Sequence, residues 1–400
     1  MVGNAASLRV GTGGGTAMDD DAQGFVDGLK GCFADLKDPR NENSCDHLLF
    51  DIVAIAVLSV ACGADDWCDM ATFAAVKIEW LRTFLALPGG APSHDTFRRV
   101  FGLLDRQQFS VNLFRWTQAL HEATGGKLIA IDGKTQRRTF ATKSGLRALH
   151  LVTAWASENG LTLGQVACEE KSNEITAIPE LLGLLNLKGC TVTIDAMGCQ
   201  TEIVEEIREQ KGHYVLAAKD NQPTLRADLQ QVFEDALDSN FADVDHDTHT
   251  TVESAHGRLT ERTYHAIEIP RDHPQRKRWR DLRTLVMATS CVTRGGEETW
   301  ETRTFISDLR PRAKLLGEAV RKHWGIENGQ HWVLDVSFHE DAARQQDRYG
   351  SANLGAVRRL IVSLLRQEKT LKRGARAKRM VCALDADYLL KVLATAEIDA

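Results

Sequence analysis

The sequence has no long apolar run and no closely spaced cysteine pair. Its longest apolar run, residues 52–62, is too short to cross a bilayer, and no basic-then-apolar leader opens the chain. Nine cysteines are scattered without a C-x-x-C pair, which argues against a zinc ribbon or a disulfide framework. We therefore expect a reduced cytoplasmic protein without a membrane partner.

A phosphate-binding loop is also missing. Gly133, Lys134 and Thr135 match the last three letters of such a loop, but the loop needs a glycine five positions before Gly133 so that backbone amides can surround the phosphates. Leu128 occupies that position. The sequence therefore predicts no nucleotide cofactor.

Charge is unevenly distributed along the chain. The formal net charge of -6 argues against a nucleic-acid binder, yet residues 358–379 hold nine Lys or Arg and one acid, Glu368. Residues 233–247 hold six acids and no Lys or Arg. Local fields decide what docks where. The basic stretch is consistent with contact to DNA, contact to a second subunit, or a solvated amphipathic helix.

The first quarter of the chain has helical periodicity after a polar start that predicts a flexible segment. A break rich in Gly and Pro precedes Ser93, a natural helix N-cap. The helix that follows carries Arg98 and Arg99, so this pair of helices fits either a DNA-reading unit or a support domain with solvated arginines. The expected helices are 48–62, 66–87, 93–104 and 106–121.

From Lys127 the pattern changes to short strands. Residues 128–131 form a buried-strand pattern that Asp132 and Gly133 are expected to close sharply, and residues 191–194 form another that ends at Asp195. Ligands of such sheets gather at strand ends. The remaining expected elements are strands 149–156, 161–168 and 213–217 and helices 174–187 and 200–210.

A β-rich insertion is expected to interrupt this mixed sheet. It has a helix at 225–238, the acidic stretch, and strands near 259–269, 284–292 and 299–309. Arg258 lies in a turn that fits a phosphate contact or an ordinary hairpin. Helical periodicity then resumes over 312–338.

Glu327 falls on the apolar stripe of that last helix. A buried carboxylate is costly without a cation or hydrogen bonds, although a Glu at the stripe's edge pairing with a neighbour is also consistent. His323 and His331 flank Glu327 by one turn, which leaves a zinc site as an alternative. Together with Asp132 and Asp195, however, Glu327 forms an all-oxygen set that suits Mg²⁺ or Mn²⁺ and in-line displacement at phosphorus. The basic Lys134, Arg137 and Arg138 would steer the DNA backbone toward it.

Several segments in one order closely resemble the bacterial DDE transposases of the H-repeat-associated insertion-sequence family. The segments are AIDGKT, ALHLVTAWASENGLTLGQV, EKSNEITAIPELL, TIDAMGCQ, HWGIENGQHWVLDVSFHED and RRLIVSLLRQEKT. The resemblance implies an α/β fold with an RNase H-like mixed sheet core, helices on both faces, a β-rich insertion and an all-helical N-terminal domain. It also implies Mg²⁺-dependent cleavage of transposon ends and joining to target DNA. By motif, Asp132, Asp195 and Glu327 match the catalytic triad.

The sequence departs from broader relatives around the glutamate. Their tyrosine, arginine and lysine are replaced here by Val320, His323 and Leu334, although Trp324 matches a frequent tryptophan. Arg321 or Lys322 is expected to substitute in gripping the DNA end.

The resulting hypothesis is a DDE transposase acting on double-stranded DNA, both terminal inverted repeats and target, as a homodimer when synapsed. It would be cytoplasmic and bacterial, and nucleoid-associated when acting. Its rivals are an RNase H-like nuclease without strand transfer and a catalytically degenerate DNA-binding relative. The expected units are a flexible segment (1–24), a helical domain (25–122), the first part of the core (125–222), the insertion (223–309), the core helix with Glu327 (310–345) and a basic helical region (346–400).

Overall fold

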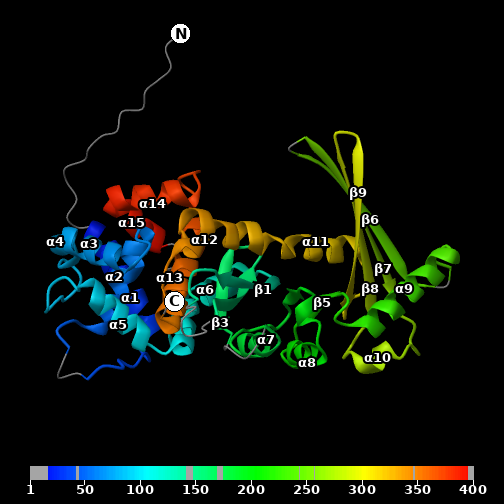
Figure 1. The fold of residues 1–400 in the computed structure, drawn as a ribbon, viewed down its shortest axis with the longest axis horizontal. Helices are drawn as coiled ribbons and strands as arrows, with labels where there is room; N and C mark the ends of the chain where they lie inside the picture. The colour runs from blue at the N-terminus through cyan, green and yellow to red at the C-terminus, as the bar shows by residue number, and fades with distance from the viewer. Residues whose placement is uncertain are drawn as a thin grey trace, which may run out of the picture.

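The computed structural model describes residues 17–41, 45–140, 147–168, 174–242, 244–255, 257–345 and 347–394 (Figure 1). A flexible start was expected for residues 1–24, and residues 1–16 of it lie outside the described ranges. Residues 17–24 are instead the beginning of helix α1 (Ala17–Phe33). Within the described ranges, no helix has the length and apolar character needed to cross a membrane.

Six helices occupy the described part of residues 17–124. Ser93 caps α5 as expected, since its hydroxyl oxygen accepts a hydrogen bond from the Thr96 amide. The single helix expected at 66–87 is wrong, because the backbone leaves the helical region at Lys77. After α1, these helices are α2 (Leu49–Ala61), α3 (Trp67–Val76), α4 (Ile78–Leu81), α5 (His94–Leu103) and α6 (Arg106–Thr124).

One sheet of nine strands runs through the rest of the molecule, in the order β3-β2-β1-β4-β5-β9-β8-β7-β6. The pairs β1-β4 and β4-β5 are parallel and the other six antiparallel, so the expected mixed sheet is confirmed. The strands are β1 (Leu128–Gln136), β2 (Leu149–Ala156), β3 (Leu161–Ala167), β4 (Thr191–Ile194), β5 (His213–Ala218), β6 (His246–Ala255), β7 (Arg258–Glu268), β8 (Thr284–Arg294) and β9 (Glu297–Ser307).

The strands expected as an insertion extend this same sheet, because β9 pairs with β5. They project as a long ribbon at one end of the molecule (Figure 1). Strand β6 was not expected from the sequence. Its side chains are mostly exposed, so it lacks the alternation of buried and exposed residues that identifies a strand.

Strand β1 does not end at Asp132 as expected. It continues to Gln136, and Asp132 pairs with Thr153 of β2. The parallel pairing of β1 with β4 ends where Ile131 meets Ile194. Asp132 and Asp195 are the residues that follow this last pair, so the sheet places them side by side. Asp195 directly follows the end of β4, whereas Asp132 lies within β1.

Helices cover both faces of the sheet. On one face, Ile129 and Ile131 pack with α7 (Glu174–Leu182), α8 (Thr201–Glu209) and α9 (Pro223–Asp238). On the other, Leu128 packs with α11 (Ala313–His323), and α13 (Arg348–Gln367) reaches Thr153 through Arg359. The remaining helices are η3 (Ala196–Gly198), α10 (Gln275–Arg278), η4 (Glu327–His331), α12 (Trp332–Ser337), η5 (Glu340–Ala342), α14 (Ala375–Leu384) and α15 (Ala386–Ala394).

The basic stretch at 358–379 is not one solvated surface. Arg358 and Arg359 of α13 and Lys378 and Arg379 of α14 are buried. Arg359 pairs with the buried Glu340, and Arg379 hydrogen-bonds backbone carbonyls of Val60 and Ala64. These four cations therefore stabilise the packing of the helices, and only the other basic residues of the stretch face solvent.

Candidate active site

Asp132, Asp195 and Glu327 line one cavity of about 220 Å³. They come from the middle of β1, the residue after β4, and the first residue of the π-helical turn η4. The cavity wall also contains two cationic residues, Lys219 after β5 and Arg303 on β9. Residues more than 60 positions apart in the sequence therefore meet at one place, with carboxylates and cations around one small space.

The environment of Asp132 opposes its ionisation. The pKa of this carboxyl is raised to about 7, first by burial and then by the negative charges of Glu174, Asp195 and Glu327. The hydrogen bond from the Gly133 amide, whose nitrogen lies 2.9 Å from Asp132 Oδ1, lowers the pKa and only partly offsets these effects. Both the burial and the neighbouring carboxylates therefore favour the protonated form of Asp132.

Asp195 is held by the short helix that it caps. Its Oδ1 accepts a hydrogen bond from the Met197 amide at 3.0 Å at the start of η3. Burial and then Glu174 raise the pKa of Asp195, while Lys219 lowers it. The cap fixes the carboxylate at the cavity.

Glu327 is exposed, not buried as the apolar stripe predicted. The expected continuous helix is interrupted: α11 ends at His323, and Glu327–His331 forms a π-helical turn before α12. A π turn changes the angular step per residue, so a stripe extrapolated from α11 assigns Glu327 to the wrong face. The glutamate reaches the cavity from its rim.

The two histidines beside Glu327 point to different partners. His323 is buried, with Nδ1 3.0 Å from Thr193 Oγ1, and burial lowers its pKa to about 4. His331 Nδ1 lies 3.6 Å from Asp132 Oδ2, and burial lowers the pKa of His331 to about 3. Both are thus neutral imidazoles at pH 7, and His323 is engaged away from Glu327.

The described residues contain no group of three His, Cys, Asp or Glu side chains arranged to hold a metal ion. The chemistry of the cavity nevertheless suits a hard divalent cation. Its three carboxylates offer oxygen ligands. The pKa of Asp132 is raised first by burial and then by neighbouring carboxylates, and a bound cation would oppose both effects by favouring the ionised form. Because these ligands are oxygen atoms, the cavity suits Mg²⁺ or Mn²⁺ better than zinc.

Glu174 and the two cavity cations were not singled out from the sequence. Glu174 Oε1 lies 2.7 Å from His150 Nε2, and a Cβ at Gly133 would come within 2.2 Å of the same oxygen. Glu174 therefore lies behind β1, on the face opposite Asp132. Glu174 lies in the segment EKSNEITAIPELL, which contributes to the family resemblance without pointing to this glutamate. Lys219 directly follows β5, so the strand-end rule that found Asp195 would also have found it.

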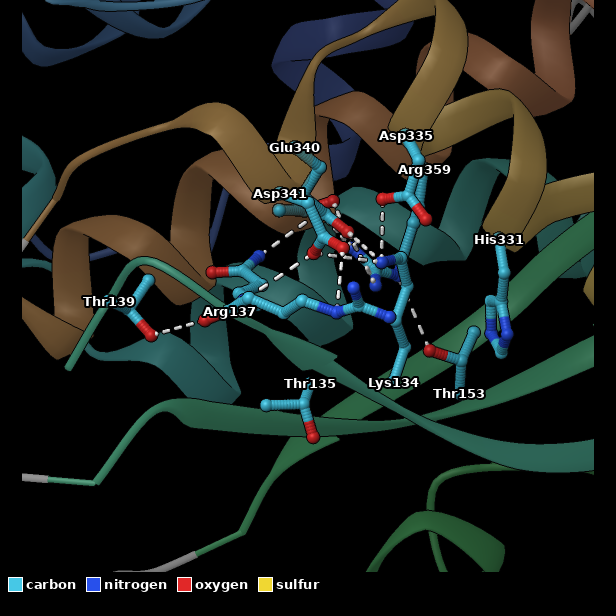
Figure 2. Close-up of polar contacts among 12 residues, drawn as sticks. Lys134, Thr135, Arg137, Thr139, Thr153, His331, Asp335, Glu340, Asp341 and Arg359 are labelled. Carbon is cyan, nitrogen blue, oxygen red and sulfur yellow. Dashed lines mark hydrogen bonds and ion pairs between the residues drawn. The ribbon is translucent and has the colours of Figure 1, made fainter.

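Lys134 does not face open solvent as a phosphate contact would. It is 8% exposed, and its Nζ lies 2.7 Å from Asp335 Oδ1 and 3.2 Å from Asp341 Oδ1. Figure 2 shows this ammonium directed at carboxylates of α12 and of the short helix η5 that follows it. Because Lys134 is buried and paired with carboxylates, the expectation that it lies near phosphate is corrected.

The neighbours of Lys134 in the sequence are more open. Arg137 and Arg138 are exposed, and Arg137 Nε lies 3.2 Å from Asp341 Oδ2. Neither arginine lines the cavity.

The other expected DNA contacts lie at several places. Arg98 and Arg99 are exposed on α5, where Arg98 pairs with Asp95. Arg258 is exposed at the tip of the ribbon, beside Arg294. The cations of α11 also have partners, Arg321 with Glu253 and Lys322 with Glu158.

Trp324 is the one member of the expected DNA-contact set that lines the cavity. The guanidinium of Arg303 stacks over its ring at 4.5 Å from the centroid. Val320 and His323, which replace the tyrosine and arginine of broader relatives, line the same wall.

The mixed sheet brings two aspartates and a glutamate to one cavity, as the resemblance to DDE transposases implies, and comparison with known sequences supports that family. The family model described as "Transposase DDE domain" matches residues 123–354, and the one described as "DDE_Tnp_1-associated" matches residues 30–117. The chain belongs to the bacterial DDE transposase family.

Individual relatives support the same membership. The chain is 38% identical to "Putative transposase YncI" of Escherichia coli O157:H7 over 90% of its length and 93% of the relative. It is 32% identical to "H repeat-associated putative transposase YhhI" of E. coli K12, over 90% and 96%. A solved piggyBac transposase synaptic complex with hairpin DNA is 10% identical, with a TM-score of 0.40 over 94% of this chain and 79% of the other, a similarity too weak to carry an argument.

Proposed function

We propose that this transposase is a metal-dependent DNA endonuclease and strand transferase whose catalytic residues are Asp132, Asp195 and Glu327. One observation carries the proposal: the three carboxylates expected from the motif converge on one cavity that also holds Lys219 and Arg303. Mg²⁺ is the proposed cofactor, and Mn²⁺ would suit the same oxygen ligands.

In this proposal each residue has a defined task. Asp132 and Asp195, fixed by β1 and by the η3 cap, and Glu327 at the rim would be the residues that hold the cation. A bound divalent ion would supply a Lewis acid that activates a water or 3′-hydroxyl and stabilises the leaving oxygen. Lys219 and Arg303 attract the scissile phosphate, and Trp324 beside Arg303 borders the place where the DNA end enters.

The partners follow from the same reaction. The protein would bind terminal inverted repeats and target DNA, as a homodimer when two ends are paired, in the bacterial cytoplasm at the nucleoid. We assign the helical domain to 25–122, the core to 125–222 and 310–345, the insertion to 223–309 and the basic helical region to 346–400. Outside the cavity, the exposed Arg98, Arg99, Arg137, Arg138 and Arg258 are proposed DNA contacts. Arg321 and Lys322 would exchange their present carboxylate partners for phosphate.

The test is Asp195→Asn with end-containing DNA and Mg²⁺. The variant keeps the oxygen that accepts from the Met197 amide and removes the charge that holds the cation. We expect unchanged DNA binding and loss of cleavage. Asp272→Asn, an exposed loop residue far along the chain from the motif, is the matched control and should cleave normally. Normal cleavage by Asp195→Asn would defeat the assignment.

Two alternative functions are distinguished from this proposal by strand-transfer and calorimetric measurements. A nuclease without a joining step would cut ends but never transfer the cut 3′-end to a second duplex. A degenerate relative would bind DNA without cutting it and would show no heat of Mg²⁺ binding in calorimetry. Asp132, Asp195 and Glu327 are all retained, and this favours the active enzyme.

A further inference from the structure

A large groove lies beside the helix that follows Glu327. Its volume is about 1090 Å³, and its walls come from α12, the C-terminal half of α13, and the segment from residue 368 through α14. These three helices lie together in the half of the molecule opposite the ribbon (Figure 1). The groove is separate from the carboxylate cavity and shares no lining residue with it.

Cations border the groove. Arg366, Lys369, Lys372, Arg373 and Arg376 all line it and all are exposed. The described part of the chain gives none of the five an ion-pair partner. Buried Lys378 differs, because its ammonium is bonded to carbonyls of Leu365 and Glu368.

The one acid in the lining does not offset this charge. Glu368 is 2% exposed. Its oxygens accept hydrogen bonds from the Thr370 amide at 2.6 Å and the Tyr388 hydroxyl at 2.8 Å, and it pairs with Lys378 at 3.2 Å. The solvent-facing groove is therefore positive, in a chain whose net charge is negative.

Exposed apolar side chains accompany these cations. Trp332 is 59% exposed, Met380 60% and Val336 47%. An exposed tryptophan beside these exposed cations suits a partner that has both negative charge and apolar surface. The phosphates of DNA supply the negative charge, and the CH groups of the deoxyribose between them supply apolar contact.

The groove adjoins the proposed active site through the protein itself. Trp332 follows the π turn that begins at Glu327. On the other side, Arg366 stacks on Trp155 at 5.3 Å and lies so close to Gly329 of that turn that a Cβ there would be 3.1 Å from Nη2. A strand lying along the groove would thus run next to the turn that presents Glu327.

We propose that this groove binds the phosphate backbone of duplex DNA, through Lys369, Lys372, Arg373 and Arg376, next to the turn that carries Glu327. This inference deepens the proposed function by naming a DNA-binding surface outside the cavity. The buried cations of the same stretch take no part. Binding is sequence-independent there, because phosphates carry no base information.

The test measures binding alone, so that it does not depend on catalysis. A fluorescent 30-base-pair duplex of arbitrary sequence is titrated with the full chain in EDTA, at several salt concentrations, by anisotropy. The fourfold variant Lys369→Gln, Lys372→Gln, Arg373→Gln, Arg376→Gln should bind more weakly. Its slope of log affinity against log salt should be shallower by about 3 to 4, since each phosphate contact contributes about 0.9.

A matched control removes four exposed cations elsewhere: Lys188→Gln, Lys211→Gln, Arg271→Gln and Lys277→Gln. It should keep the wild-type slope, and both variants should keep the wild-type circular dichroism spectrum. Equal slopes for wild type and the groove variant would overturn the proposal. So would an unchanged slope with loss of self-association in sedimentation, which would assign the groove to an acidic surface of a second copy. Failure of Asp195→Asn to abolish cleavage would leave this slope unaffected, so the two proposals fail separately.

Discussion

The ammonium of Lys134 lies 2.7 Å from the carboxylate of Asp335, and this contact joins β1 to the helix that follows Glu327. It is one of three contacts along the same face of β1. Asp132 faces His331 at 3.6 Å, and the amide of Gln136 donates to Glu340 at 3.0 Å. Alternate residues of the strand thus contact successive positions that begin at the last residue of the π turn, His331. The placement of Glu327 relative to Asp132 depends on this register.

Lys134→Met should therefore destabilise the fold and weaken the site together. It leaves Glu340 and Asp341 without one of their cations, in a place where Lys134 is buried. We expect a loss of about 3 kcal/mol in the free energy of unfolding, at the low end for a broken buried pair because Asp335 is partly exposed. Urea unfolding measures it.

The control for this change is Lys188→Met, which removes an exposed loop cation. It should alter stability by less than about 0.5 kcal/mol. If Lys134→Met unfolded at the same urea concentration as the wild type, the contact with Asp335 would be a minor surface pair and would not set the register.

Much of this arrangement could be predicted from local patterns. The strand before Asp195, the hairpin of β2 and β3, and the Ser93 cap follow from alternation and capping, which act over a few residues. The continuation of β1 past Asp132 could not, because Lys134 and Gln136 are polar residues whose burial depends on Asp335 and Glu340, two hundred positions away. The exposed setting of Glu327 was missed for a related reason, since a π turn cannot be read from a helical stripe. The motif predicts Asp132, Asp195 and Glu327 as the catalytic residues without either piece of geometry.

Glu368 should make the free energy of unfolding depend on pH in the acid range. Burial alone would raise the pKa of this carboxyl, but hydrogen bonds from Thr370, Tyr388 and Lys378 outweigh it and lower the pKa to about 2 from an ordinary 4.5. The ionised form is therefore favoured by folding. This stability is present above pH 4.5 and is lost as the pH falls through about 2.

The corresponding measurement compares wild type with Glu368→Gln in urea at pH 7 and near pH 2. The variant should be less stable by more than about 1 kcal/mol at pH 7, because one pKa unit corresponds to about 1.4 kcal/mol. The difference should shrink toward pH 2. If Glu368→Gln lost the same free energy of unfolding at both pH values, the packing of the Glu368 side chain, and not its charge, would be what stabilises the fold. Glu79→Gln, at an exposed pair with Arg82, should show almost no deficit at either pH.

In the metal-free protein, Asp132 should change the free energy of unfolding with pH in the direction opposite to Glu368. Its pKa is raised from 3.8 to about 7, so the folded state holds a proton that the unfolded chain has lost. The associated stability is complete below pH 4 and disappears as the pH rises through about 7. Asp132→Asn keeps an oxygen for the Gly133 amide and removes the charge. The variant should be more stable than wild type at pH 8 by more than about 1 kcal/mol, and equal to it near pH 4.

Thermal or urea unfolding in EDTA at the two pH values measures this difference, with Asp272→Asn as the exposed control. Adding Mg²⁺ at pH 8 should stabilise wild type by mass action and leave Asp132→Asn almost unchanged, so that the advantage of the variant narrows. The order of events matters, because the same carboxylate must lose its proton before it can hold a cation. If Asp132→Asn were less stable than wild type at pH 8 in EDTA, the aspartate would be a structural residue, and the cavity would lose the unneutralised charge on which the proposed chemistry depends.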